Sequence, residues 1–416
     1  MGVRMARVYP FRAVRPHTGQ AEAVADVPYD VVTRDEAAAL AAARPLSFLH
    51  VTRAEVDLPS VTDPYADIVY RTAAGNFSRM REGGPLLQDD TPGLYVYRLR
   101  MGSHEQTGLA ACFDLDEYER GAIVRHERTR RDKEDDRTRH ILEVAAQTGP
   151  VFLAYPAAPD VDALVAAATT GEPLADFTAE DGVRHTTWRV SHQAVQPLVD
   201  AFDAISRVYI ADGHHRAASA QRARQAIRNG RADTGPLEAD RFLGVAFPHS
   251  QTQILPYHRI VKDLDGYTPR GFLDALREQG RVAPGREAPG AKGRVSMYLD
   301  GGWHEIVLNP APAGAPAEER LDVALLHDQV LHPLLKIGDP RTDPRIGFVG
   351  GLRGAEELRR LVESGAAAAA FALHPISVGE LMEISDGGGI MPPKSTWFEP
   401  KLRDGLLTHV IEQARG

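Results

Sequence analysis

The amino-acid sequence predicts a mixed α/β (α+β) fold, on three observations. The chain has 416 residues, 43% hydrophobic and 25% charged, which is typical of a folded globular protein of two or three domains. Short apolar runs alternate along it with Ala-rich stretches of good helix formers, such as residues 35–43. At one place an apolar strand, residues 207–211, leads through a polar turn directly into a helical stretch, residues 217–230.

The first part of the chain predicts a hairpin followed by a charged segment. Residues 94–100 and 108–113 read as strands, and Gly102 and Ser103 offer a turn, so we expect a β-hairpin. Residues 125–140 are nearly all charged, with both signs interspersed. Taken alone, that pattern favours a solvent-exposed helix with ion pairs between residues four apart.

The rest of the chain alternates in the same way. Apolar runs predict strands at residues 151–155, 186–190, 207–211, 241–247, 253–261 and 345–349. Good helix formers predict helices between residues 155 and 186 and at residues 217–230, 321–335 and 355–364. Asn229 and Gly230 are the expected stop of the helix at residues 217–230. Pro/Gly-rich residues 283–293 and residues 309–317 predict loops.

Composition excludes several classes of protein. With 48 Lys+Arg against 57 Asp+Glu, the formal net charge is −9, which does not attract a nucleic-acid backbone, so we expect no nucleic-acid partner. The single cysteine, Cys112, excludes an internal disulfide or a multi-thiolate metal site and fits a reducing compartment. Residues 1–16 lack the apolar core of an export signal, and no run approaches the about 20 residues of a membrane span. We expect a cytoplasmic protein outside membranes.

The strongest chemical signal is the run Asp212, Gly213, His214, His215 and Arg216, between the predicted strand and helix. Helix N-termini attract anions, a glycine lets a phosphate approach the main chain, and an arginine can grip phosphate oxygens. The imidazoles can move protons, and Asp212 could hold a divalent cation or cap the helix. The alternative is a plain helix cap followed by two surface histidines. Adjacent helical residues point about 100° apart, which disfavours a zinc site made by the two histidines together.

Two further clusters suit anions. Lys394, Ser395 and Thr396, with Lys401 further on, put two ammonium groups and two hydroxyls in a proline-stiffened segment, although a surface loop is the alternative. A strand carrying His258 and Arg259 could present both to an anion or could simply be exposed.

Common catalytic signatures are missing. His126-Glu127 is followed by an arginine at the fifth position, so there is no zincin motif. The chain also has no phosphate-binding P-loop, no complete Gly-x-Gly-x-x-Gly and no nucleophile elbow.

At residues 212–216 the sequence resembles the free-serine kinases, enzymes of the ParB/sulfiredoxin-like fold that phosphorylate the hydroxyl of free L-serine. Those kinases carry a catalytic glutamate in an Ile-x-x-His-Glu-like segment upstream, and Ile123-Val-Arg-His-Glu127 fits that description. The resemblance therefore implies that Glu127 is the general base.

The whole chain also resembles a bacterial family of uncharacterised conserved proteins (DUF1015-type) related to those kinases. The resemblance rests on Val27-Pro-Tyr-Asp30, Arg125-His-Glu-x-Thr129, Asp212-Gly-His-His-Arg216, Tyr257-His-Arg259 and Met391-Pro-Pro-Lys-Ser-Thr396. Together they imply an N-terminal α/β segment at residues 1–110 and a ParB/sulfiredoxin-like catalytic core at residues 111–262. An insertion near residues 151–199 is expected to fold aside, and a C-terminal α/β segment at residues 263–416 is expected to contribute a phosphate-binding loop.

The expected activity is transfer of a phosphoryl group to free L-serine from pyrophosphate, ADP or ATP, with Mg²⁺. The expected catalytic residues are Glu127, His126, Asp212, His214 and His215, and Asp212 is the expected metal ligand. The expected binding residues are Gly213, Arg216, Arg125, Arg128, Arg131, His258, Arg259, Lys394, Ser395, Thr396 and Lys401. Two alternatives remain open: a ParB-like nucleotide-binding or DNA-associated regulator, and a phosphate or nucleotide hydrolase that uses the same site.

Overall fold

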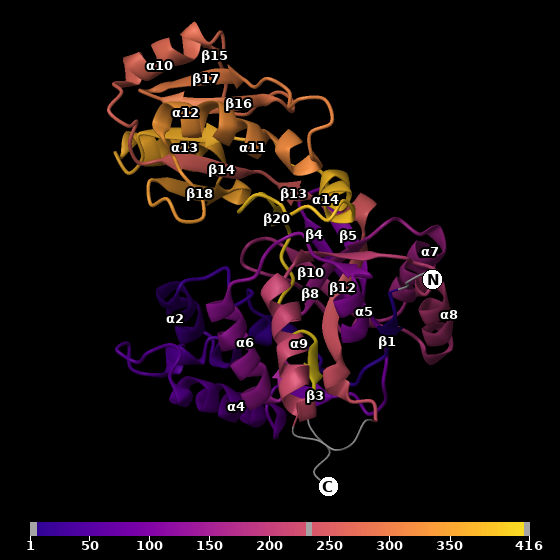
Figure 1. Cartoon of the computed structure of the whole chain (residues 1–416). Coiled ribbons are helices and arrows are strands. Elements are labelled where there is room, and N and C mark those ends of the chain that lie inside the picture. Colours follow the sequence, from indigo (N-terminus) through magenta and orange to yellow (C-terminus); the bar gives the residue numbers. More distant parts are fainter. Residues whose placement is uncertain (1–5, 230–234, 412–416) are drawn as a thin grey trace. The chain divides into compact units, whose positions relative to one another are not determined.

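The computed structural model describes residues 6–229 and 235–411, which form two compact units. Unit 1 comprises Met1–Thr252 with Pro400–Gly416, and unit 2 comprises Gln253–Glu399. Both contain helices and sheets, which confirms the mixed α+β class (Figure 1). The predicted segment boundaries at residues 110 and 262 stay predictions.

The core of unit 1 is a large mixed sheet. In the described residues it has nine strands, in the order β6-β11-β8-β12-β5-β4-β10-β9, with β1 paired to β5. The pairs β6–β11 and β8–β12 are parallel, and the other pairs are antiparallel. The strands are β1 (Val8–Tyr9), β4 (Tyr95–Met101), β5 (His104–Asp114), β6 (Ile123–Val124), β8 (Val151–Tyr155), β9 (Ala175–Thr178), β10 (Arg184–Arg189), β11 (Val208–Asp212) and β12 (Arg241–Pro248).

A second sheet brings the C-terminal segment back into unit 1. Its order is β3-β2-β21-β7. The strands are β2 (Ala13–Pro16), β3 (Leu86–Gln88), β7 (Ala146–Gln147) and β21 (Thr408–Val410). β21 pairs with both β2 and β7, so the chain returns from unit 2 to complete unit 1.

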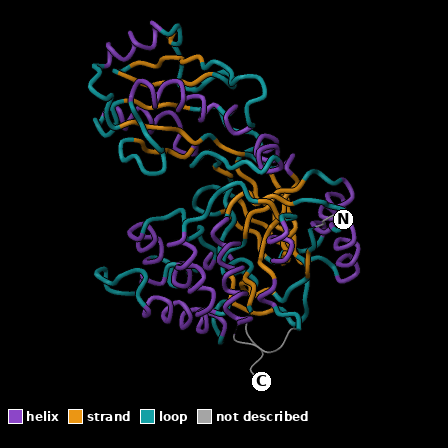
Figure 2. Tube along the Cα trace, viewed as in Figure 1, coloured by secondary structure: helices purple, strands orange, loops and turns teal. Residues whose placement is uncertain are grey.

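Helices surround the grouped strands of unit 1 (Figure 2). They are α1 (Ala21–Val24), α2 (Arg34–Ala42), α3 (Leu49–Thr52), α4 (Asp67–Arg81), α5 (Leu115–Arg120), α6 (Arg131–Val144), α7 (Pro159–Ala167), α8 (His192–Phe202) and α9 (His214–Asn229). α2 begins at a capping box in which Thr33 and Glu36 satisfy each other's backbone N–H groups. α6 packs against α9, as Figure 1 shows.

Several predictions can be compared directly with unit 1. The hairpin is confirmed as β4 and β5, and Gly102 in the turn has a φ of 58°. The charged residues 125–140 become a loop and then α6, one face of which is buried. On that face Asp136 accepts from the Tyr70 hydroxyl, and His140 bonds to the Val51 carbonyl. The predicted helix at residues 217–230 is α9, while Gly230, like residues 1–5 of the N-terminal stretch, lies outside the described residues.

The predicted insertion does not fold aside. Residues 151–199 supply β8, which lies between β11 and β12 in the large sheet, and β10, which pairs with β4. The reason is visible in β8 itself, whose five residues are all buried. A strand that is apolar throughout is stable only where both faces of the sheet are covered.

Unit 2 is built around a six-stranded antiparallel sheet in its described residues, in the order β15-β17-β16-β19-β14-β18. Its strands are β14 (Tyr257–Val261), β15 (Val282–Pro284), β16 (Arg294–Leu299), β17 (Gly302–Val307), β18 (Ile346–Gly350) and β19 (Ala369–Ala372). Its helices are α10 (Pro269–Glu278), α11 (Asp322–Leu326), α12 (His332–Leu335), α13 (Gly354–Glu363) and α14 (Val378–Asp386). The predicted strand at residues 253–261 is split at Pro256 into β13 (Ile254–Leu255) and β14, and β13 pairs with β20 (Trp397–Phe398).

Across residues 6–229 and 235–411, every helix is too short or too polar to cross a lipid bilayer.

Candidate functional site

Two parallel strands of the large sheet bring the two halves of the candidate site together. β6 pairs with β11 in parallel, with Ile123 opposite Val208 and Val124 opposite Tyr209. Parallel strands end at the same edge of a sheet. The residues that follow β6, Arg125 to Glu127, therefore lie beside the turn that follows β11.

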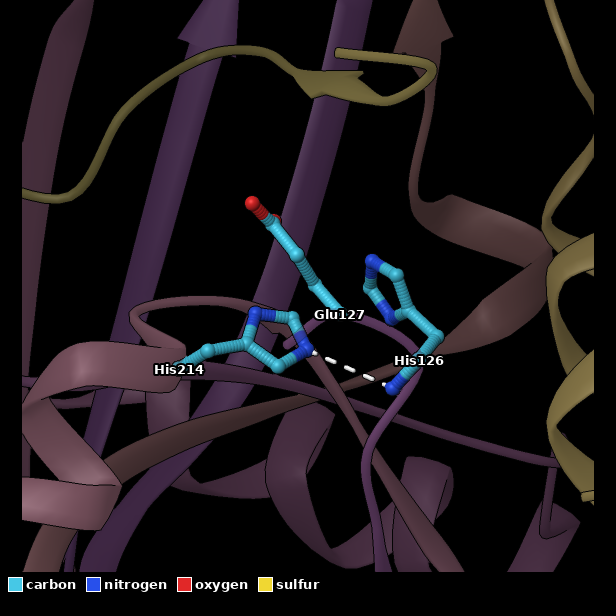
Figure 3. Close-up of side chains that lie close together, drawn as sticks. All are labelled: His126, Glu127 and His214. Carbon is cyan, nitrogen blue, oxygen red and sulfur yellow. Dashed lines mark hydrogen bonds between the residues drawn. The ribbon is translucent and has the colours of Figure 1, made fainter. Parts of the chain in front are cut away.

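His126 and His214 are in direct contact at this edge. Their ring centroids are 4.4 Å apart, at an interplanar angle of 85°. The backbone N–H of His126 donates to Nε2 of His214 over 3.5 Å. Glu127 is exposed, and its carboxylate reaches the same place, so that one ligand atom from each of the three side chains lies within 4.8 Å of the others. Figure 3 shows the Glu127 side chain rising between the two rings.

Both rings favour the neutral form. Burial lowers the pKa of His126 to about 4, although the Ile210 carbonyl and the Asp212 carboxylate act in the opposite direction. Burial also lowers the pKa of His214 well below its usual range, and the proximity of His126 adds to that shift. Two uncharged imidazoles, each able to accept a proton or bind a cation, thus lie beside an exposed carboxylate.

Asp212 ends β11 and is held from two sides. Its Oδ1 accepts from the backbone N–H of Gly213 over 2.8 Å, and its Oδ2 accepts from Nζ of Lys401 over 2.8 Å. The side chains of Asp212 and Lys401 are 32% and 18% exposed. Burial opposes ionisation of Asp212, but Lys401 and Arg216 outweigh it and hold the pKa of this carboxyl well below its usual range. Lys401, chosen from sequence as an anion-binding residue, thus lies at the site.

His215 and Arg216 continue α9 but face other neighbours. Nε2 of half-buried His215 accepts from the backbone N–H of Arg130 over 3.0 Å, and burial lowers the pKa of its ring. Arg216 is buried, and its guanidinium donates to Asp30 Oδ1 over 3.0 Å and to the Pro150 carbonyl over 2.8 Å. Arg216 therefore links the start of α9 to Asp30 and to the segment that precedes β8.

The three predicted arginines of the charged segment are exposed. Arg125 follows β6 and stacks over the Tyr118 ring at 5.0 Å. Arg128 lies in the loop after Glu127, and Arg131 is the first residue of α6. All three belong to the short connection between β6 and α6, so they are neighbours of the candidate site along the chain.

His258 and Arg259 lie on β14 of unit 2 and are both buried. His258 Nδ1 accepts from the Leu373 backbone N–H over 3.2 Å, and burial lowers the pKa of the ring to about 4. The Arg259 guanidinium donates to the carbonyls of Tyr257, Pro393 and Lys394 over 2.8–3.0 Å. Arg259 thus holds the loop that carries Lys394.

The predicted clamp of Lys394, Ser395, Thr396 and Lys401 is divided between the units. Lys394, Ser395 and Thr396 belong to unit 2, and Lys401 belongs to unit 1. Lys394 is exposed, with a φ of 53°, while Ser395 is buried and donates to the Pro392 carbonyl over 2.6 Å. Folding of residues 394–396 over the site stays a prediction.

A buried layer of charged side chains next to the start of α9 was not predicted from the sequence. A small cavity is lined by Tyr29, Arg137, Arg216 and Asp404, among others. The Tyr29 ring stacks under the guanidinium groups of Arg137 at 4.2 Å and Arg216 at 5.7 Å. The signal available was the run Val27-Pro-Tyr-Asp30, to which the sequence reasoning gave no role; Asp404, near the C-terminus, carried no local signal.

Comparison with known proteins places these features in context. A family model described as "Protein of unknown function (DUF1015)" matches residues 8–324. No curated protein matches the chain. A solved free serine kinase in complex with AMP is 14% identical, with a TM-score of 0.34, over 70% of this chain and 86% of that chain.

Two further solved structures are similar. A conserved hypothetical protein from Pyrococcus furiosus is 15% identical, with a TM-score of 0.35, over 72% of this chain and 95% of that chain. SbnI with a C-terminal truncation, from Staphylococcus aureus, is 11% identical, with a TM-score of 0.35, over 74% of this chain and 90% of that chain. At these identities and TM-scores the likenesses assign no activity to this chain.

Proposed function

This chain belongs to the family described as "Protein of unknown function (DUF1015)", and we propose that it is a small-molecule kinase. The proposed reaction transfers a phosphoryl group from pyrophosphate, ADP or ATP to the hydroxyl of free L-serine, giving O-phosphoserine. The observation that carries the proposal is the parallel pairing of β6 with β11. That pairing brings together the two motifs through which the sequence resembles the free-serine kinases, the segment ending in Glu127 and residues 212–216.

Glu127 is the proposed general base. A kinase needs a group that accepts the proton of the attacking hydroxyl, and a carboxylate held near the transferred phosphate meets that need. Glu127 is exposed, so a substrate can reach it, while the two imidazoles beside it are buried and fixed. His126 and His214 are proposed to set the position of the acceptor rather than to carry charge, because burial keeps both rings neutral.

The proposed phosphate grip combines backbone and side-chain charge. The N-terminus of α9 presents the positive end of the helix dipole at Gly213, whose φ of 92° shapes the turn. Lys401 brings an ammonium group to the same turn through its bond to Asp212. Arg125, Arg128 and Arg131, exposed on the connection from β6 to α6, are proposed to hold the carboxylate of serine or outer phosphate oxygens.

Asp212 is suited to the role of the proposed Mg²⁺ ligand. Mg²⁺ in phosphoryl-transfer sites is commonly held by one or two carboxylates together with substrate phosphates, and a carboxylate has about four lone-pair positions. Asp212 uses one on the Gly213 N–H and one on Lys401, which leaves room for a cation. When bound, Mg²⁺ supplies charge neutralisation on the donor phosphates. Before Mg²⁺ binds, the ammonium group of Lys401 keeps the Asp212 carboxylate ionised.

The decisive experiment measures O-phosphoserine by mass spectrometry after incubation with L-serine, Mg²⁺ and each donor in turn. We expect the Glu127→Gln variant to lose about 10²–10⁴-fold in turnover, as removal of a general base does. The matched control is Glu143→Gln, an exposed glutamate at the end of α6, which should keep full turnover. Lys401→Met should raise the KM for the donor.

Full turnover of folded Glu127→Gln would contradict the assignment of the base. Orthophosphate released at the same rate with and without L-serine would instead indicate a hydrolase in which water takes the place of serine. Retained donor affinity in Lys401→Met would remove Lys401 from the phosphate grip.

A further inference from the structure

We propose that His126, Glu127 and His214 bind one divalent transition-metal ion of the Zn²⁺ or Co²⁺ type, separate from the Mg²⁺ assigned to Asp212. These side chains form the one group of three or more potential His, Cys, Asp or Glu ligands found in residues 6–229 and 235–411. Two imidazole nitrogens and one carboxylate oxygen suit Zn²⁺, Fe²⁺, Co²⁺ or Ni²⁺, whereas Mg²⁺ prefers an all-oxygen set. The inference does not rest on the proposed kinase activity.

The geometry of the three side chains is close to that of a metal site. One ligand atom from each lies within 4.8 Å of the others. With bonds of about 2.0–2.2 Å, ligand atoms around one ion lie about 3–4 Å apart, so a small closure is needed. Glu127 can make that movement because it is exposed, while the packed rings of His126 and His214 hold two of the three positions in place.

An independent observation points to a missing partner. His126 is 1% exposed, and neither of its ring nitrogens makes a contact of full hydrogen-bond geometry within the described residues, although the Ile210 carbonyl lies near enough to favour the protonated ring. Buried polar atoms nearly always have a partner. The ring lies against His214 and beside Glu127, the other two potential ligands, as Figure 3 shows. A cation at this point would satisfy one of the two unmet nitrogens.

The surroundings of the three side chains suit a bound cation. Burial favours the neutral form of both rings, which is the form that binds metals. His214 Nε2 accepts from the His126 backbone N–H over 3.5 Å, so in the neutral ring Nε2 carries the lone pair and Nδ1 carries the proton. An ion would bind the lone pair of Nε2 in place of this long contact. His215 faces away, toward the backbone of Arg130, so the adjacent histidines do not compete for one ion.

The site would be of the open type. Structural zinc sites in proteins have four protein ligands, whereas catalytic ones have three and an exchangeable position. Here the described residues supply three. The remaining position would take water or an oxygen of a phosphate group, the ligand class to which the N-terminus of α9 is also suited. With such an ion bound, Glu127 is a ligand and cannot also accept the serine proton, so metal binding and the proposed base role exclude each other in the same molecule and are tested separately.

The test uses the full chain without a polyhistidine tag, stripped with a chelator. Co²⁺ is titrated while its visible d–d absorption is recorded, and Zn²⁺ is titrated by calorimetry. We expect one equivalent of each ion to bind, with d–d bands of four- or five-coordinate Co²⁺. Glu127→Gln and His214→Asn should each weaken binding by more than about tenfold, since even an outer-shell partner is worth about 10–100-fold.

The controls are Glu143→Gln and His192→Gln, which remove an exposed glutamate and an exposed histidine of unit 1 and should bind like the unchanged protein. Circular dichroism verifies that each variant is folded. Because Glu127 is exposed, its variant keeps the test valid if His214→Asn does not fold.

Absence of a stoichiometric Co²⁺ or Zn²⁺ site, or equal binding by folded Glu127→Gln, would overturn the inference. Phosphoserine formation by stripped protein with Mg²⁺ alone, together with no Co²⁺ binding, would reject the metal site and keep the kinase. One bound Co²⁺ without phosphoserine would reject the kinase and keep the metal site.

Discussion

Asp404 is a carboxyl group enclosed among charged side chains of unit 1. It is 1% exposed and lines the same cavity as Tyr29, Arg137 and Arg216. Burial raises the pKa of this carboxyl to about 7, and the negative charge of Asp30 adds to the effect, although Arg216 opposes it. A group that titrates near neutral pH thus lies directly beneath the start of α9.

We predict that Asp404 makes the protein less stable as pH rises. Its pKa is higher in the folded chain than its ordinary 3.8, so its stabilising contribution is complete below about pH 4 and is lost as pH rises through 7. Asp404→Asn removes this term because the amide does not titrate. Urea unfolding at pH 5, 6, 7 and 8 should show the unfolding free energy of the variant rising relative to that of the unchanged protein, by up to about 3 kcal/mol between pH 5 and pH 8.

Other titrating groups are common to both proteins and cancel in the difference. Parallel stability profiles for Asp404→Asn and the unchanged chain would show that Asp404 is ionised in the folded protein throughout this range.

The turn between β11 and α9 requires a glycine for its backbone conformation, not because a side chain would lack room. Gly213 has a φ of 92°, a value that residues with a Cβ rarely adopt. A Cβ added there would meet Val151 and Arg216 atoms at 3.4 and 3.5 Å, which is ordinary contact. The glycine is therefore required by its dihedral angle, and it sets where α9 begins relative to Asp212.

We predict that Gly213→Ala lowers the free energy of unfolding by about 1–3 kcal/mol, the usual range for a non-glycine residue in such a conformation. Activity should fall with it, since the turn positions Asp212 and His214. The matched control is Gly171→Ala: Gly171 has a φ of −86° and open space at its Cβ. Its effect should stay within about 0.5 kcal/mol. Equal unfolding midpoints for the two variants would contradict the role given to Gly213.

Elements with a strong local signal were predictable from sequence. The hairpin β4–β5, the buried strand β8 and the β11–α9 junction each show their pattern within one short window. The strands β16, β17 and β19 were missed. β19 is an Ala-rich run, and alanine favours helix, but its four residues are all buried in the sheet of unit 2. Burial in the sheet of unit 2 therefore outweighed the helix propensity of alanine.

The candidate site was predictable in its parts but not in its contacts. Glu127 and residues 212–216 were identified from motifs, and Lys401 from its charge. The packing of His126 on His214 depends on the parallel pairing of β6, a strand of two residues that carries no signal of its own. The inward bonds of Arg216 and Arg259 likewise depend on distant partners, Asp30 and the carbonyls at residues 393 and 394.

Unit 2 is inserted between two parts of unit 1. It spans Gln253–Glu399, and the chain then returns to contribute Lys401 and β21 to unit 1. Within unit 2, β13 pairs with β20, so the first and last strands of the segment lie side by side. Its apolar core, which includes Phe272, Met297 and Phe371, comes entirely from its own residues.

We predict that residues 253–399 fold when expressed alone, because both ends meet and the core is internal. Thermal unfolding followed by circular dichroism should be cooperative, and the proton–nitrogen NMR spectrum should be dispersed. In contrast, a full chain truncated after Glu399 should lose stability in unit 1, since β2 and β7 lose their common neighbour. A collapsed, narrow NMR spectrum for residues 253–399 would show that unit 2 needs unit 1 to fold.

We propose that phosphoryl transfer takes place at the edge of the large sheet where β6 and β11 end. It is tested most directly by phosphorus NMR of the unchanged protein with Mg²⁺ and L-serine, with pyrophosphate, ADP and ATP in separate samples. We predict a phosphoserine resonance in at least one sample, which also identifies the donor, and its absence when L-serine is omitted. Unchanged donor resonances in all three samples would contradict it.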